Sequence, residues 1–189
     1  MKKKIIAFGL GLFMLLAVAI PQMNIWADET AKSVDIMFLH DTHSHLNAFD
    51  TIEDGKTVTL GGFSRIKTLM NEQMAENPDT LLLDAGDFSM GTLIQVMYEE
   101  EASELRMLGQ LGIEATTLGN HEFDYKAQGI SNMMNTAVAS GDTLPEMLLC
   151  NMDWEAMKEA GLTEDQQLIL SAFENYGVRD YMVIEKGGV

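Results

Sequence analysis

The sequence predicts an α/β fold in which a mostly parallel sheet is flanked by helices. Two observations support this prediction. Short apolar runs rich in β-branched residues alternate with longer segments whose apolar residues recur at helical spacing, as in successive βαβ units. In addition, 47% of the 189 residues are hydrophobic, which is typical of a globular chain of about one domain.

The first predicted elements follow this alternation. Residues 34–39 form a short apolar run and are predicted to be a buried strand. The polar stretch after them contains a turn at residues 53–56. A helix is predicted from Gly62 to the helix-breaking pair at residues 77–78, and a second strand over residues 80–83.

The remaining elements continue in the same order. The apolar spacing predicts helix 93–111, strand 114–118, helix 125–139, strand 146–150, helix 153–176 and strand 181–184. Strands that are separated by helices pair in parallel, because the crossover returns the chain to the same end of the sheet.

The first 27 residues are predicted to be a cleaved signal peptide. Residues 2–4 are lysines, residues 5–20 are all apolar or glycine, and Asp28 is the first acidic residue. The alternative is an uncleaved membrane anchor, but the apolar run is shorter than the roughly 20 residues that cross a bilayer. We therefore expect cleavage after Ala27, no stable membrane insertion afterwards, and a secreted or extracytoplasmic protein in the periplasm or at the cell surface.

The charge of the chain excludes one class of partner. The formal net charge is −17, and after position 27 nine basic residues face 29 acidic ones, a net charge of −20. Nucleic-acid binding depends on basic residues that neutralise phosphates, so no nucleic-acid partner is expected. The single cysteine, Cys150, excludes an internal disulfide and a zinc site built from several thiolates.

Polar motifs follow three of the predicted strands, at residues 40–45, 84–87 and 119–124. The carboxyl ends of neighbouring parallel strands meet at one edge of a sheet, so these motifs are expected to share a crevice. Their carboxylates, imidazoles and carboxamide suit zinc, manganese, iron or cobalt better than calcium. Each residue alone would be an ordinary polar loop residue, but their joint spacing favours a metal site.

The residue types predict how such a site would work. Asp41 and His43 lie two positions apart in an extended segment and can reach one ion together. Asp87 follows a glycine and has two oxygens with which to bridge two ions, and Asn120 offers a neutral oxygen to the second. Two divalent ions, zinc, manganese or similar, would then hold a metal-bound hydroxide and a phosphoryl oxygen.

Four further residues near this site have predicted roles. His121 is expected to stabilise or protonate the leaving group, and Asp124 to fix the tautomer and orientation of its ring. Asp84 is expected to bond within its own loop, and Glu122 to fix its loop through backbone hydrogen bonds.

The motifs Asp41-x-His43, Gly86-Asp87 and Gly119-Asn-His-Glu122 together resemble the metallophosphoesterase signature. Over residues 34–125 the chain resembles the exported bacterial 5′-nucleotidase family, which includes UDP-sugar hydrolases and 2′,3′-cyclic-nucleotide phosphodiesterases and lies within the calcineurin-like superfamily.

The resemblance implies a four-layer αββα catalytic domain with a dinuclear metal centre. It implies metal ligands that match Asp41, His43, Asp87 and Asn120, and a catalytic pair that matches His121 and Asp124. The family's remaining ligands are histidines further along its chain, whereas no histidine follows His121 here. Residues 28–189 are therefore expected to be a truncated N-terminal portion of the catalytic domain, the alternative being a small complete domain.

The predicted function is metal-dependent hydrolysis of a phosphoric ester, with a nucleotide or another phosphate ester as substrate. The alternative is an exported fragment that binds or interacts but is catalytically incomplete. Four ligands shared between two ions leave each ion under-coordinated, and we therefore expect weak metal binding and little turnover from the 189-residue chain.

Overall fold

The computed structural model describes residues 33–189. The predicted signal peptide lies outside the described residues and stays a prediction. Within the described residues, none of the helices combines the length and the apolar character needed to cross a membrane.

The centre of the fold is a four-stranded parallel sheet, in the strand order β1-β4-β5-β6. Its strands are β1 (Ile36–Leu39), β4 (Leu81–Asp84), β5 (Ala115–Thr116) and β6 (Glu146–Met147). The predicted α/β fold with a parallel sheet and flanking helices is confirmed, and four of the predicted strands are present in shortened or shifted form. The carboxyl ends of β1, β4 and β5 are neighbours, as the placement of the polar motifs requires.

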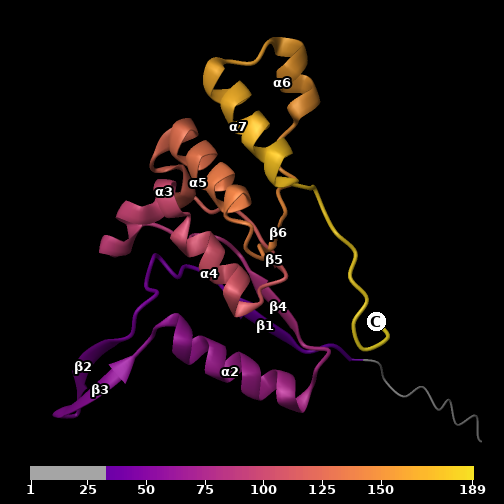
Figure 1. The fold of residues 1–189 in the computed structure, drawn as a ribbon. Coiled ribbons are helices and arrows are strands. Elements are labelled where there is room, and N and C mark those ends of the chain that lie inside the picture. Colours follow the sequence, from indigo (N-terminus) through magenta and orange to yellow (C-terminus); the bar gives the residue numbers. More distant parts are fainter. Residues whose placement is uncertain (1–32) are drawn as a thin grey trace, which may run out of the picture. The chain divides into compact units, whose positions relative to one another are not determined.

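Helices cover one face of this sheet and form the core with it. The longer helices are α2 (Phe63–Glu76), α4 (Ser103–Leu111), α5 (Lys126–Ser140) and α7 (Glu164–Tyr176). Helix α2 packs against α4, and α5 packs against α7 and against the short helix α3 (Tyr98–Glu101) (Figure 1). The apolar side chains Leu82, Leu105, Ile130, Met133 and Met147 are at most 2% exposed between these layers. Burial of such side chains, at about 1.5–3 kcal/mol each, is the main stabilising contribution.

A β-hairpin lies in the stretch that was expected to be polar with a turn. Strands β2 (Phe49–Glu53) and β3 (Lys56–Leu60) pair antiparallel, and the predicted turn joins them. Asp54 and Gly55 both have positive φ, 50° and 76°, which is the backbone of a type I′ turn. The Asp-Gly pair between alternating Thr, Ile and Val residues is a hairpin signal that the sequence offered.

The predicted helix 93–111 is wrong as a single element. The structure divides it into η1 (Leu93–Met97), α3 and α4, with Ala102 in the left-handed conformation at φ 47° between the last two. In an unbroken helix Tyr98 and Glu104, six residues apart, would point in directions about 120° apart. The break lets both side chains reach the loops at the carboxyl edge of the sheet.

The predicted helix 153–176 is also divided. Helix α6 (Trp154–Ala160) ends before Gly161, and Thr163 begins α7 with a capping box in which its side chain and that of Gln166 bond each other's backbone. A Thr three residues before a Gln is a readable helix start.

The predicted strand over residues 181–184 is wrong. Among residues 177–189, only Arg179 pairs with the sheet. Its N–H donates to the Met147 carbonyl, and its carbonyl accepts from the Leu149 N–H. One of these bonds is to Met147, the last residue of the two-residue strand β6, and the other is to Leu149 beyond it. Tyr181 and Val183 are consequently exposed. The second sheet of the expected four-layer sandwich stays a prediction, since residues 33–189 contain one parallel sheet and one hairpin.

Candidate metal centre

The loops that follow β1 and β4 continue the pairing of the two strands beyond their ends. The N–H groups of Asp41, His43 and Ser44 donate to the carbonyls of Gly86, Asp87 and Phe88 over 3.1, 3.1 and 2.8 Å. These bonds place two of the predicted polar motifs side by side.

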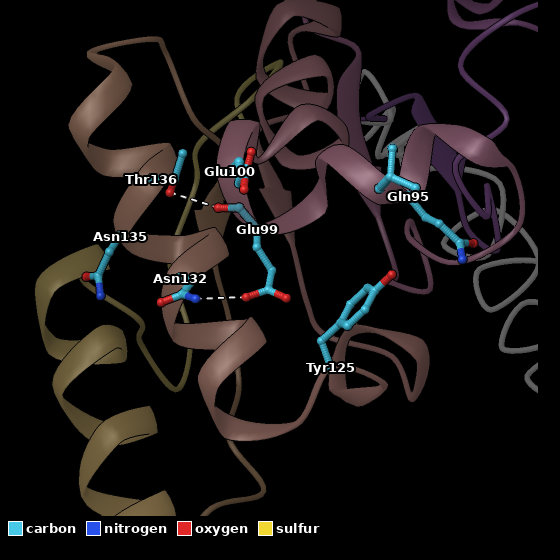
Figure 2. Close-up of a pocket in the computed structure, with 8 residues that line it drawn as sticks. Gln95, Glu99, Glu100, Tyr125, Asn132, Asn135 and Thr136 are labelled. Carbon is cyan, nitrogen blue, oxygen red and sulfur yellow. Dashed lines mark hydrogen bonds between the residues drawn. The ribbon is translucent and has the colours of Figure 1, made fainter.

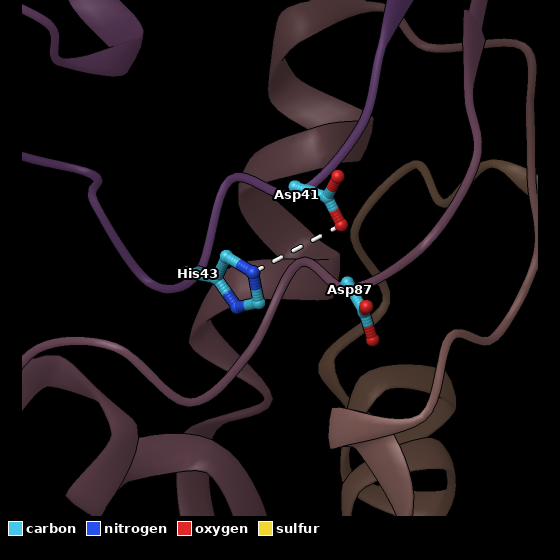
Figure 3. A group of neighbouring side chains, drawn as sticks. All are labelled: Asp41, His43 and Asp87. Carbon is cyan, nitrogen blue, oxygen red and sulfur yellow. Dashed lines mark ion pairs between the residues drawn. The ribbon is translucent and has the colours of Figure 1, made fainter.

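Asp41, His43 and Asp87 form one cluster of possible metal ligands. One ligand atom from each residue lies within 4.8 Å of the others (Figure 3). The His43 Nε2 atom lies 3.9 Å from an Asp41 oxygen. Two carboxylates and one imidazole in this space repel or compete without a cation, and their oxygen and nitrogen donors suit a divalent transition metal. The residues therefore fit a metal ion of this kind.

The orientation of the His43 ring is fixed by a backbone carbonyl. Its Nδ1–H donates to the Ser89 carbonyl over 3.2 Å, so Nε2 is the nitrogen with a free lone pair. Metal-binding histidines commonly use one ring nitrogen in this way while the other binds the ion.

The backbone of the cluster is conformationally strained. Asp41, His43, Ser44 and Asp87 have φ values between 43° and 55°, in the left-handed region that side chains disfavour. Such residues cost of order 1–3 kcal/mol each and occur preferentially at functional sites. The hydrogen bonds between the two loops offset this cost.

The loop after β5 contacts Asp87 directly. The His121 N–H donates to Asp87 Oδ1 over 2.9 Å, and a Cβ at Gly119 would lie 2.1 Å from the same oxygen. Only glycine therefore allows this approach. Asn120 is exposed between these residues, at the start of the short helix η2 (His121–Phe123). Its predicted role as a ligand stays a prediction.

The predicted catalytic pair lies next to the metal cluster. The His121 Nδ1 atom is 2.8 Å from Asp124 Oδ2, and this hydrogen bond raises the pKa of His121 above its ordinary value. The ring centres of His121 and His43 are 5.0 Å apart in an edge-to-face arrangement. The structure thus brings the pair and the three possible ligands together at one edge of the sheet.

Two neighbouring carboxyl groups have shifted pKa values. The hydrogen bond from His40 lowers the pKa of Asp41 below its usual range. Burial raises the pKa of Asp84 to about 6, and hydrogen bonds from Thr116 and the Gly86 N–H oppose the shift. The Gly86 bond confirms the prediction that Asp84 bonds within its own loop.

Two buried glutamates hold these loops in place through hydrogen bonds. Glu122 accepts hydrogen bonds from the backbone of Asp87, Ser89 and Gly119, as predicted for a loop-fixing residue. Glu104 accepts from the hydroxyls of Ser44 and Ser103, a role that sequence reasoning missed. No local pattern around Glu104 indicates it, because Ser44 lies 60 residues away.

One cavity is lined by none of the three clustered residues. It measures about 580 Å³ and lies between α3 and α5 (Figure 2). Two of its polar side chains bond to Glu99: Asn132 donates to the Glu99 carboxylate and Thr136 donates to the Glu99 carbonyl. A second cavity of about 510 Å³ adjoins the loop after β1 and has Phe49 and Leu93 in its wall.

Comparisons with known proteins agree on one family of phosphoesterases. Residues 34–174 match the calcineurin-like phosphoesterase family. Over 106 residues the chain is 33% identical to the 5′-nucleotidase of Rattus norvegicus, covering 53% of this chain and 18% of that protein. Over 155 residues it is 28% identical to the NAD 5′-nucleotidase of Haemophilus influenzae, covering 77% and 25%.

A solved structure gives the same result for the fold. The 5′-nucleotidase precursor of Thermus thermophilus superposes with a TM-score of 0.59 at 27% identity, covering 81% of this chain and 26% of that one. The chain therefore spans a quarter or less of the length of these curated relatives.

Proposed function

This chain belongs to the calcineurin-like phosphoesterase family, and we propose that it functions as a metal-dependent phosphoric ester hydrolase that acts on nucleotides. The observation that carries the proposal is the cluster of Asp41, His43 and Asp87 with the His121 ring 5.0 Å from that of His43. Ligands for a cation and a proton donor thus lie within the length of one phosphate ester.

In this proposal Asp41, His43 and Asp87 hold divalent metal, and Asn120 contributes to a second ion. When bound, such ions polarise a phosphoryl oxygen and activate water as a nucleophile. The mature chain is strongly acidic and would repel a phosphate ester by itself. Cations at this cluster therefore supply the positive charge that substrate binding needs.

His121 is proposed to donate a proton to the leaving oxygen. Its Nδ1 bonds to Asp124, which leaves Nε2 free to face a substrate. The raised pKa of His121 keeps more of this side chain protonated at neutral pH, the form that a general acid requires.

The substrate class comes from the relatives. Both sequence relatives are named as 5′-nucleotidases, one of them for NAD, and this supports nucleotides as substrates. Export by the first 27 residues, proposed from the sequence, would place the activity outside the cytoplasmic membrane.

Metal titration and phosphate release test this proposal on the purified chain. Mn²⁺ binding is measured by calorimetry, and release from 5′-AMP is compared with release from p-nitrophenyl phosphate. We expect metal binding and a slow hydrolysis of 5′-AMP that EDTA abolishes, because three clustered ligands coordinate an ion incompletely.

The alternative outcomes are distinct. Metal binding with no hydrolysis of either ester would favour the catalytically incomplete binding fragment. No binding of Mn²⁺, Zn²⁺ or Co²⁺ would contradict the proposed metal centre. Equal hydrolysis of the two esters would contradict the preference for nucleotides.

A further inference from the structure

We propose that Glu122 is the positioning residue of the metal centre: it fixes Asp87 directly and His43 through Ser89. This inference rests on the proposed function, because it concerns the same cluster. It extends that function by assigning the geometry of both ligands to one buried carboxylate that touches neither metal nor substrate.

Four hydrogen bonds converge on the Glu122 carboxylate. Oε2 accepts from the N–H of Asp87 over 3.1 Å and of Gly119 over 2.6 Å. Oε1 accepts from the N–H and the hydroxyl of Ser89 over 3.0 and 2.8 Å. The Glu122 side chain is 0% exposed, so water does not replace any of these bonds.

These bonds act on two of the three clustered residues, Asp87 and His43. Asp87 has φ 52°, and the bond from its N–H helps to maintain this strained conformation. Ser89 presents its carbonyl to His43 Nδ1 while its N–H and hydroxyl are bound to Glu122. A shift of Ser89 would therefore rotate the His43 ring that the metal needs.

The chemistry of the donors requires a carboxylate at this position. All four partners donate, and an ionised carboxylate is the side chain that only accepts. A glutamine would present an amide NH₂ to two donors and leave buried N–H groups without a partner, which is costly. Glu122→Gln keeps nearly the same side-chain shape, so it tests directly whether the carboxylate positions these loops.

The main chain of Glu122 is itself held in place. Its carbonyl accepts from the hydroxyl of Tyr98 over 2.8 Å, and Tyr98 is 0% exposed and stacks on Tyr125. The carboxylate is therefore fixed relative to the helical core, and it transmits that rigidity to the loops.

The first measurement is amide hydrogen exchange by NMR without metal. In Glu122→Gln we expect the N–H groups of Asp87, Ser89 and Gly119 to exchange about tenfold faster or more, because each lost bond to a buried charge is worth at least this factor. Glu104→Gln is the matched control. Its partners are serine hydroxyls, which can turn and accept, so those three N–H groups should keep their protection.

The second measurement is the affinity for Mn²⁺. We expect Glu122→Gln to weaken it about 10- to 100-fold, the range found when a residue behind a metal ligand is changed. Thermal unfolding is followed in parallel. A lower melting temperature with unchanged Mn²⁺ affinity of the folded protein and unchanged exchange at the three amides would overturn the proposal, because Glu122 would then be merely structural.

A gentler variant covers the case in which Glu122→Gln does not fold. Ser89→Ala removes one of the four donors and leaves the backbone bonds, so a smaller loss of Mn²⁺ affinity in the same direction is expected. Unchanged affinity would contradict the role of Ser89. If the parent chain binds no metal, the proposed function fails, whereas the amide exchange still decides whether Glu122 holds the two loops.

Discussion

Two regions of this chain lie beside strands of the parallel sheet and differ in how their backbone is held in place. The site edge, meaning residues 40–45, 85–91 and 117–124, lies at the ends of strands that pair in parallel. The C-terminal segment, residues 177–189, contains the apolar run that was predicted as a fifth strand. Hydrogen bonds between loops fix the backbone of the site edge, whereas the C-terminal segment pairs with the sheet only at Arg179.

The difference shows that an apolar run becomes a strand only when an adjacent strand offers free partners. Strand β1 pairs along its whole length with β4, from Ile36 to Leu39. The two-residue strand β6 ends at Met147, and Arg179 forms a single bridge with Leu148 beyond it. Further along the C-terminal segment, Val183 is 87% exposed. We therefore expect changes at the site edge to have large effects and changes in the C-terminal segment to have small ones.

The largest effect is expected for Asp87→Ala. The change removes the proposed ligand oxygens and also the acceptor for the His121 N–H, so Mn²⁺ binding should become undetectable by calorimetry. Asp180→Asn, in the exposed C-terminal segment, is the control and should bind Mn²⁺ like the parent. Retained affinity in Asp87→Ala would show that the cluster is not the metal site.

The next largest effect is expected for His121→Ala. Loss of a general acid lowers turnover by about 10²- to 10⁴-fold, and we expect this loss with 5′-AMP at unchanged metal content. The loss should be smaller with p-nitrophenyl phosphate, whose leaving group departs without a proton. Equal losses with both esters would contradict proton donation by His121.

The residues of the candidate site could be proposed from the sequence because their pattern is local. Asp41 and His43 are two positions apart, and Asp87 follows a glycine at the end of a strand, so the order of strands brings the two loops together. The extended backbone expected for Asp41 and His43 is wrong, because both have left-handed φ values and are held by hydrogen bonds to the loop after β4. The parallel sheet and its helices were predictable from the same alternation. The role of Glu104 was not, because its partner Ser44 lies 60 residues away and only tertiary packing joins them.

The errors in the fold prediction have the same cause. Helical spacing continues through Ala102, and the local pattern does not contain the packing of Tyr98 and Glu104 against the site edge that requires the break there. For residues 181–184, the run is apolar and β-branched but its partner strand is too short. The sequence pattern of a segment indicates which secondary structure it favours, and its hydrogen-bond and packing partners in the fold determine whether that structure forms.

A moderate effect on stability is expected for Asp84→Asn, just below the site edge. The pKa of Asp84 is raised to about 6 by burial, from an unfolded value of 3.8. Between these two pH values the unfolded chain releases the proton and the folded chain keeps it, so stability falls as pH rises. Above pH 6 the free energy of unfolding of the parent should have fallen by up to about 3 kcal/mol, a loss that Asp84→Asn should not show.

Urea unfolding of both proteins at pH 4.5 and pH 7.5 measures this difference. The asparagine keeps an acceptor for the Gly86 N–H, so the comparison isolates the buried charge. The gap in unfolding free energy between variant and parent should widen in favour of the variant at the higher pH. An equal gap at both pH values would mean that Asp84 is not the source of the pH dependence.

The smallest effect is expected for Lys186→Ala, in the C-terminal segment. Lys186 Nζ lies 2.9 Å from a Glu114 oxygen, and the two side chains are 23% and 30% exposed. A partly exposed ion pair of this kind contributes about 0.2–1 kcal/mol, so the free energy of unfolding should fall by no more than this and Mn²⁺ affinity should not change.

Lys158→Ala is the control, because Lys158 also pairs with one carboxylate, Glu174, at a longer 3.9 Å on the surface of the last two helices. If Lys186→Ala costs several times more than Lys158→Ala, or if it weakens Mn²⁺ binding, the C-terminal segment stabilises the sheet as the predicted fifth strand would. The contrast between the two regions would then be wrong. The ion pair of Lys186 would fix the backbone of residues 177–189, as the hydrogen bonds between loops fix the site edge.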